Sequence, residues 1–270
     1  MRSLLLALIT LATTVSNAWA WGDTGHRVVC DLAFQLSSAE TRAEIRRLIK
    51  TDAQFKSFPD SCIFPDHPRQ RAPEHFINLA RTSDGIAAGG HCPTASTCTL
   101  TAIEQDMAVL SSGSAKDADK LKSLKFLGHW VGDIHQPLHV SFEDDRGGNN
   151  IAVRGRCSTN LHSTWDTCLL QIAVGADVHA VATDLFNSIT AAKKQEWSTT
   201  SPRDWANESF AIAEAAATKY CVKHGSSCDL PNGTVTIDDG YVQANAKILR
   251  EQLQKAAVRL AHLLESALGK

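Results

Sequence analysis

Residues 129–139 read His129-Trp-Val-Gly-Asp133-Ile-His135-Gln-Pro137-Leu-His139, which places three histidines and an aspartate in eleven residues. His129 and Asp133 are four positions apart, so on a helix both side chains lie on one face. Pro137 ends or kinks that helix and can turn His139 toward the same side. The residues just before this stretch, 124–128, are mostly apolar. Imidazole and carboxylate groups in such a segment are costly to bury unless they are paired or bind a metal.

Taken by itself, this stretch is equally consistent with core histidines that are satisfied by backbone carbonyls. Similar groups elsewhere in the chain favour a metal centre instead. His162 and Asp166 repeat the four-residue spacing; one such pair is typical of a salt-bridged helix face, but two pairs and His139 are explained more simply by several metal ions. His139, His162 and Asp166 would give one ion three ligands and leave room for water, and imidazole and oxygen ligands without thiolate suit zinc.

The first twenty residues are typical of a secretory signal peptide. They contain Arg2, an apolar run over 4–15 and an Ala18-Trp-Ala20 cleavage site, so we expect a secreted or periplasmic protein. Cleavage would leave Trp21 first in the mature chain, where its α-amino nitrogen and carbonyl oxygen could chelate one metal ion together with His26. The alternative is a capped helix start with an ordinary surface histidine.

A proline-rich segment supplies further candidates. Asp60 stands in Phe58-Pro-Asp-Ser-Cys62, and His75 follows fifteen positions later. Asp66 stands in a similar setting and competes with Asp60, and either aspartate is also typical of a turn or helix cap. The run Gly147-Gly-Asn149-Asn predicts a tight turn, whose backbone amides could also face a phosphate or a base.

The cysteine content indicates an oxidising compartment, and the charge pattern does not indicate a basic surface that follows a nucleic-acid backbone. The chain has eight cysteines and no Cys-x-x-Cys pair, and its net charge is -2 without a basic stripe. Close spacing suggests the disulfides Cys92–Cys98, Cys157–Cys168 and Cys221–Cys228, which leaves Cys30 with Cys62; the sequence alone also allows other pairings.

The hydrophobic pattern predicts one mainly helical domain with a few short strands. Helices are expected over 22–36, from the Ser37-Ser38 cap to about 50, over 99–111 and 118–135, from 161 onward, and over 178–190, 202–221 and 238–268. Extended segments are expected at 74–79 and 151–154. Irregular loops are expected at 55–73 and 82–98.

Together these residues resemble the zinc-dependent, single-strand-preferring type I nucleases, the family of mung bean nuclease and its fungal, plant and bacterial relatives. The motifs match in order over residues 21 to about 170, and the C-terminal third matches only in being helical. They are Trp21-Gly22-x-x-Gly25-His26, Asp60, His75-Phe76, His129-x-x-Gly132-Asp133-x-x-Gln136-Pro137-Leu138-His139, Gly147-Gly148-Asn149 and His162-Ser163-x-Trp165-Asp166-Thr167.

The resemblance implies a fold shared with bacterial phospholipase C, a trinuclear-zinc nuclease domain over residues 21–270, and three Zn²⁺ per chain. Carried over residue by residue, it assigns Asp60, His75 and His129 to the first zinc, His139, His162 and Asp166 to the second, and Trp21 and His26 to the third, with Asp133 bridging the first and third. Asp133 and Asp60 are then the expected catalytic carboxylates.

The function that the resemblance implies is hydrolysis of single-stranded DNA and RNA by in-line attack of water, which leaves 5′-phosphates. Activity as a 3′-nucleotidase is a further expectation, and the expected partners are single strands and nucleotides, with no membrane and a monomeric chain. About six positive charges on three zinc ions would replace a basic stripe. Phe76 is the expected wall of a base pocket, and Asn78 and Asn149 are expected to read the base edge.

Two positions depart from the fungal pattern. The arginine expected three positions after Asp60 is Ile63 here, so Arg69 or Arg71 would have to reach in from the same loop, and the aspartate expected three positions after His75 is Asn78. Two rival functions remain: a trinuclear-zinc phospholipase C, which should show an exposed apolar rim, and a zinc-binding protein without turnover.

Overall fold

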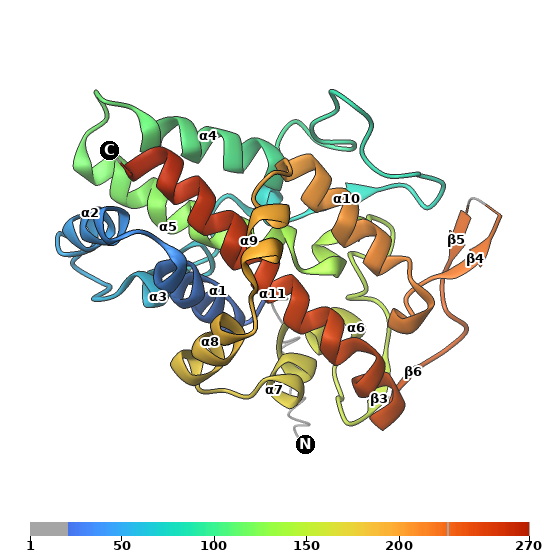
Figure 1. The fold of residues 1–270 in the computed structure, drawn as a ribbon. Helices are drawn as coiled ribbons and strands as arrows, with labels where there is room; N and C mark the ends of the chain where they lie inside the picture. Colours follow the sequence, from blue (N-terminus) through green and yellow to red (C-terminus); the bar gives the residue numbers. More distant parts are fainter. Residues whose placement is uncertain (1–20, 226, 270) are drawn as a thin grey trace, which may run out of the picture.

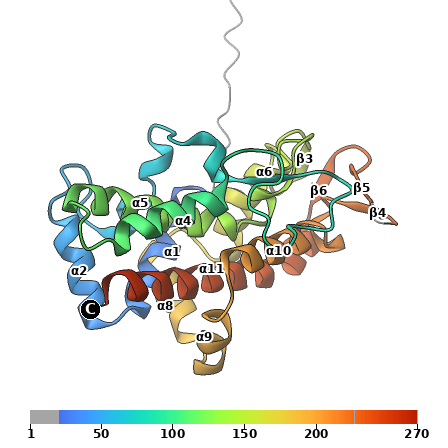
Figure 2. The same cartoon turned by 90° about the horizontal axis from the view of Figure 1, so that it is seen from above.

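The longest helix, α11 (Asp239–Leu268), crosses the molecule, and the helices of the N-terminal half pack against it (Figure 1). The computed structural model describes residues 21–225 and 227–269, and the expected signal peptide lies outside the described residues. Helices α1 (Asp23–Leu36), α4 (Thr99–Ser111) and α5 (Asp117–Ile134) contact α11. In Figure 2, α4 and α5 lie on one side of α11, whereas α8 (Val178–Asn187) and α9 (Ala191–Trp197) lie on the other.

Further helices and helical turns complete the domain. They are α2 (Ala39–Ile49), α3 (Phe58–Ser61), α6 (Leu161–Ser163), α7 (Leu169–Ala173) and α10 (Pro202–Ala213), with the 3₁₀ turns η1 (Phe64–Asp66), η2 (Ala72–His75), η3 (Pro137–His139) and η5 (Ala216–Thr218) and the π-helical turn η4 (Thr164–Cys168). The Ser38 side chain caps α2 by accepting from the Thr41 backbone N–H, as the sequence predicts.

The strands form three pairs. β1 (Ile77–Leu79) and β2 (Val140–Phe142) run parallel, as do β3 (Val153–Gly155) and β6 (Val235–Ile237), whereas β4 (Val222–His224) and β5 (Ser227–Asp229) are antiparallel. In the first pair, Ile77 lies opposite Val140. Because His75 and His139 stand just before these two strands, the pairing brings the two histidines together.

The four disulfides are those that the sequence suggests. They join Cys30 to Cys62, Cys92 to Cys98, Cys157 to Cys168 and Cys221 to Cys228. The first of these ties α1 to the residue that follows α3. In the described residues no single helix has the length and hydropathy of a membrane span; a bent pair, 161–173 with 178–187, passes that test only by length and composition.

The prediction of one mainly helical domain with short strands is confirmed. Helix α9 and strands β4, β5 and β6 are not among the expected elements, and two further segments differ from expectation. The expected loop at 55–73 contains three short helical turns, because Pro59, Pro65 and Pro73 each stand in a first turn, where proline is tolerated. The helix expected over 202–221 ends at Ala213, because the Thr218 hydroxyl donates to the carbonyls of Ala213 and Ala215 and folds the chain back.

Candidate metal centre

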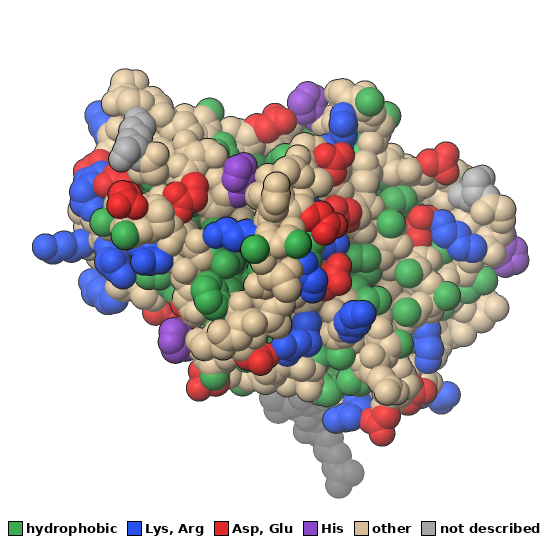
Figure 3. Space-filling model, viewed as in Figure 1, with side chains coloured by type: hydrophobic (Ala, Val, Ile, Leu, Met, Phe, Trp, Pro, Cys, Tyr) green, Lys and Arg blue, Asp and Glu red, His purple; other side chains and the backbone are tan. Residues whose placement is uncertain are grey.

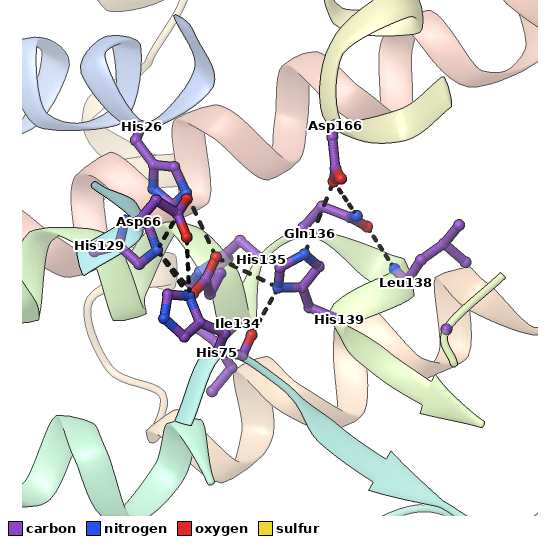
Figure 4. Close-up of polar contacts among 12 residues, drawn as sticks. His26, Asp66, His75, His129, Ile134, His135, Gln136, Leu138, His139 and Asp166 are labelled. Carbon is purple, nitrogen blue, oxygen red and sulfur yellow. Dashed lines mark hydrogen bonds and ion pairs between the residues drawn. The ribbon is translucent and has the colours of Figure 1, made fainter. Parts of the chain in front are cut away.

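Buried histidines and aspartates from seven helical elements and turns converge on one region (Figure 4). They form three groups, in each of which the candidate ligand atoms lie within 4.8 Å of one another, and the first two share His129: His26, His129 and Asp133; Asp66, His75 and His129; and His139, His162 and Asp166. Asp133 lies between the groups, with Oδ2 3.3 Å from His129 Nε2 and Oδ1 3.3 Å from His139 Nδ1. Eight side chains that are far apart in sequence therefore share one polar interior.

Helix α5 supplies His129 and Asp133 from one face, as the four-residue spacing predicts. Helix α1 brings His26 against this face at Gly132, where an added Cβ would lie 2.6 Å from His26 Nδ1. Glycine within a helix costs about 1 kcal/mol relative to alanine. The close approach of the imidazole to the α5 backbone explains why glycine occupies this position.

Backbone carbonyls orient the imidazoles. His129 Nδ1 donates to the Cys62 carbonyl at 2.8 Å, and His75 Nε2 donates to the Gln70 carbonyl at 2.9 Å. The other ring nitrogens, His129 Nε2 and His75 Nδ1, then face each other at 3.1 Å. In neutral imidazoles both of these atoms are hydrogen-bond acceptors, so their lone pairs need a shared cation or proton.

The third group, which consists of His139, His162 and Asp166, is oriented in the same way. His139 Nδ1 donates to the His75 carbonyl and His162 Nδ1 to the Gly147 carbonyl, each at 2.7 Å. Their Nε2 atoms then face Asp166, at 3.8 Å and 3.3 Å from its carboxylate oxygens. The Gln136 amide donates to Asp166 Oδ1 at 2.5 Å and fixes the orientation of that carboxylate.

The polar atoms at the centre lack hydrogen-bond partners among the described residues. These atoms are both ring nitrogens of His26, both carboxylate oxygens of Asp133, Nε2 of His139 and Oδ2 of Asp166. An unsatisfied buried polar group costs about 1–3 kcal/mol, and more when it is charged. Converging nitrogen and oxygen lone pairs without thiolate are the donor set that zinc takes in catalytic sites, so the residues present fit the metal.

Burial and charge shift the titration of these groups. Burial raises the pKa of Asp166 well above its usual range, whereas for Asp133 the attraction of His129 and His139 outweighs burial and holds the pKa well below the usual range. Although burial disfavours its protonated form, Asp133 and Asp66 raise the pKa of His129 to about 9. Negative surroundings that hold a proton on His129 also favour a divalent cation.

The geometry contradicts the prediction that Asp60 is a metal ligand and a catalytic carboxylate. The Asp60 side chain is 53% exposed, accepts from the Ser57 hydroxyl at 2.6 Å and faces Arg27 at 3.4 Å. Asp66, the competing candidate, is buried, with Oδ1 3.6 Å from His75 Nδ1. The reason is local: Ser57 caps α3 and holds Asp60 at the surface, whereas the next turn, η1, directs Asp66 inward.

This correction also removes one of the two departures from the fungal pattern. Arg69 follows Asp66 by three positions, which is the spacing expected of the family arginine. Arg69 lines a pocket of about 370 Å³ that opens beside His139 and His162. Phe76, Asn78 and Asn149, the three residues expected to bind the substrate, line the same pocket.

A buried hydrogen-bond network holds the glycine turn at the edge of this pocket. Asp145 is 2% exposed and binds Arg81 Nη2 at 2.6 Å, the Tyr220 hydroxyl at 2.8 Å and the Gly148 N–H at 2.8 Å. Gly147 adopts φ +64°, and an added Cβ would lie 2.5 Å from the Leu138 carbonyl oxygen. The expected tight turn is present, and its backbone orients His162.

Two groups of residues escaped the sequence interpretation. Gln136 is part of the motif around Asp133, but its neighbours in the sequence do not indicate that its amide binds Asp166. Asp106, 3% exposed, accepts from the Trp130 indole N–H at 2.9 Å, and the indole packs edge-on against His75 and His129, at ring-centroid distances of 4.8 and 5.3 Å. This support depends on the packing of α4 against α5 and has no signature in the sequence.

Trp21 lies fully buried beside the third group, which contains Asp166. The backbone N–H of Gly22, the next residue, donates to the Asp166 carbonyl at 2.8 Å, and the Trp21 side chain packs against Gly25. His26 Nε2 lies 3.5 Å from Asp133 Oδ1. The start of the described chain is thus anchored at the centre, which is what chelation by its amino end requires.

A pair of alanine substitutions distinguishes the two aspartates. We expect Asp66→Ala to lower bound zinc and to reduce hydrolysis by more than the ~10–100-fold that loss of an outer-shell partner typically costs. The matched control, Asp60→Ala, removes an exposed carboxylate and should retain zinc and activity. Zinc content and kcat/KM on a single strand would be measured; the reverse ranking would restore Asp60 as the ligand.

Comparison with known proteins finds relatives that match nearly the whole chain. The family model described as S1/P1 Nuclease matches residues 21–269. Endonuclease 4 of Arabidopsis thaliana is 27% identical over 98% of this chain and 94% of its own length, and Nuclease S1 of Aspergillus oryzae is 28% identical over 98% and 97%. Nuclease P1 of Penicillium citrinum is 29% identical over 60% of this chain and 62% of its own length. The chain belongs to the S1/P1 nuclease family.

Proposed function

We propose that this zinc-dependent nuclease is a secreted endonuclease that hydrolyses single-stranded DNA and RNA to 5′-phosphate products. Family membership supports the nuclease activity, and relatives named as endonucleases match nearly the whole chain. The observation that carries the proposal is the set of unsatisfied imidazole and carboxylate atoms that converge beside a pocket. The four disulfides support an extracellular location.

We propose that this ligand set binds three zinc ions. Asp66, His75 and His129 would hold the first, His139, His162 and Asp166 the second, and the amine and carbonyl of Trp21 with His26 the third, with Asp133 shared between the first and third. Bound zinc would polarise phosphate oxygens and neutralise their charge. Asp133 and Gln136 would keep the ligand set in position while a phosphodiester is bound.

The pocket supports a preference for unpaired nucleotides. Phe76 is half-buried in its wall and can stack on a base, while the carboxamides of Asn78 and Asn149 can each donate to and accept from a base edge. Arg69 can bind the phosphate from the same wall. A base in a duplex cannot enter without leaving its stack, so single strands are favoured. A terminal nucleotide would fit the same pocket, which supports 3′-nucleotidase activity.

Replacing Phe76 with alanine tests the pocket. Stacking on an aromatic ring contributes about 1–3 kcal/mol per base, so we expect Phe76→Ala to raise KM for a short single strand by about 5–150-fold while zinc content stays the same. Phe186→Ala, at a 39% exposed phenylalanine on α8, is the matched control. An unchanged KM would remove Phe76 from the pocket.

The function itself is tested by incubating the refolded mature protein, with and without chelator, with single-stranded DNA, RNA and phosphatidylcholine. We expect both nucleic acids to be cleaved to 5′-phosphate products, and the chelator to stop cleavage. Hydrolysis of the lipid alone would instead make the chain a phospholipase. Bound zinc without any hydrolysis would make it a binding protein.

A further inference from the structure

A second groove is lined by residues that do not belong to the metal centre. It encloses about 500 Å³ between α1, α2 and α3. Its apolar wall consists of Phe34, Ile45, Ile49 and Phe58, of which only Phe34 is partly exposed. No part of the proposed catalysis uses these residues.

Three cations, Arg46, Lys50 and Lys56, surround this apolar wall. All three are exposed, and the Arg46 guanidinium lies 5.0 Å from the centre of the Phe34 ring. None of the three makes an ion pair within the described residues. The nearby carboxylates are already engaged, Asp52 by Lys125 at 2.8 Å and Asp60 by Arg27 at 3.4 Å.

The basic character of this end of the molecule is local. Lys and Arg side chains gather where α2 lies, at the left of the face in Figure 3. In a chain whose net charge is -2, this gathering is not a consequence of overall composition. Lys56 donates to the Asp52 carbonyl and Arg46 lies over Phe34, so neither charge is neutralised by a carboxylate. An apolar wall edged by such cations is complementary to a ligand that carries flat apolar groups and repeated negative charge.

A short stretch of the chain connects the groove with the metal centre. Phe58 and Pro59 of α3 line the groove, and Cys62, the residue after α3, accepts from His129 and is bridged to Cys30. The helix that lines the groove is thus joined directly to a residue that orients one of the candidate metal ligands.

We infer that this groove is a second binding site for single-stranded nucleic acid, in which bases contact the apolar wall while phosphates bind Arg46, Lys50 and Lys56. The inference rests on the proposed function, because the strand bound in the groove is the continuation of the strand being cleaved. A duplex would present only its phosphates here, since its bases are stacked inside.

The test compares long and short substrates in the zinc-loaded protein. We expect Lys50→Glu to lower kcat/KM about tenfold for a strand of about 20 nucleotides, which exceeds the ~4–16 nucleotides that single-strand-binding folds cover, and to leave kcat/KM for a dinucleotide the same. Each phosphate contact contributes about 0.7 to the salt dependence of single-strand binding, so the slope of log(1/KM) against log salt should fall by about that amount or more. The control of equal charge change is Lys247→Glu, at an exposed lysine on α11 that forms no ion pair with the residues that the structure describes.

Each outcome decides the inference. Equal loss on both substrate lengths, or no loss on either, would overturn it, while a wild-type protein that cleaves neither substrate would overturn the proposed function instead. If Lys50→Glu does not fold, Lys56→Glu takes its place with the same expected result. A last experiment measures binding of the protein to vesicles of phosphatidylglycerol. If Lys50→Glu abolishes this binding and leaves the kinetics on the long strand unchanged, the groove binds an anionic lipid and the inference is wrong.

Discussion

Replacing Asp133 with alanine is expected to abolish hydrolysis and to lower the zinc content of the protein. This carboxylate is fully buried, and its oxygens lie 3.3 Å from His129 Nε2 and 3.5 Å from His26 Nε2. Its removal deletes the negative charge shared by two of the three ligand groups. Because charge stabilisation by metal is worth several kcal/mol, we expect a loss of about 10³-fold or more in kcat.

Zinc per chain and kcat on a single strand would be measured for Asp133→Ala beside Asp184→Ala. Asp184 is exposed on α8 and pairs with Arg250, so its replacement should change neither quantity. An Asp133→Ala protein with full zinc and wild-type kcat would show that this carboxylate does not bridge metal ions.

Retaining one extra residue before Trp21 is expected to remove the third zinc and most of the activity. The extension converts the α-amine of Trp21 into an amide, which is a much poorer metal ligand. Because Gly22 is tied to the Asp166 carbonyl and Trp21 is fully buried, the chain end has little freedom to offer another ligand. We expect two zinc ions per chain instead of three.

The control keeps the amine and changes the side chain. Trp21→Phe with correct processing should retain the third zinc, although loss of the buried indole should lower the midpoint of thermal unfolding. Full activity and three zinc ions in the extended protein would contradict chelation by the amino end.

The sequence predicts those parts of the centre whose geometry is local. The spacing of His129 and Asp133 on an apolar helix is sufficient to place both on one face, and Pro137 is sufficient to end the helix before His139. The long amphipathic patterns of α5 and α11 likewise predict those helices to within a residue or two. In each case the determining interactions lie within one or two turns of the chain.

The choice between Asp60 and Asp66 is different, because both follow proline in nearly the same local sequence. What separates them is which turn is capped by a serine and which turn packs against α5, and the second of these depends on tertiary structure. The basic groove has the same origin. Arg46 and Lys50 suit the C-terminal end of a helix, and only the fold brings Lys56 and Phe58 beside them.

Supporting residues are the least visible in the sequence. Gln136 acts through Asp166 and Asp106 through Trp130, while Asp145 links the glycine turn to Tyr220. Each of these contacts joins residues more than 20 positions apart. Their residue types are common in turns and on helix surfaces. Only their burial in the structure indicates that they orient metal ligands.

The central claim is that the converging histidines and aspartates bind three metal ions. The most direct test is the zinc content of the mature protein, measured by elemental analysis after exhaustive dialysis without chelator. We expect three zinc ions per chain, all of which a strong chelator removes together with nuclease activity. A correctly folded, active protein that holds no zinc would contradict the account.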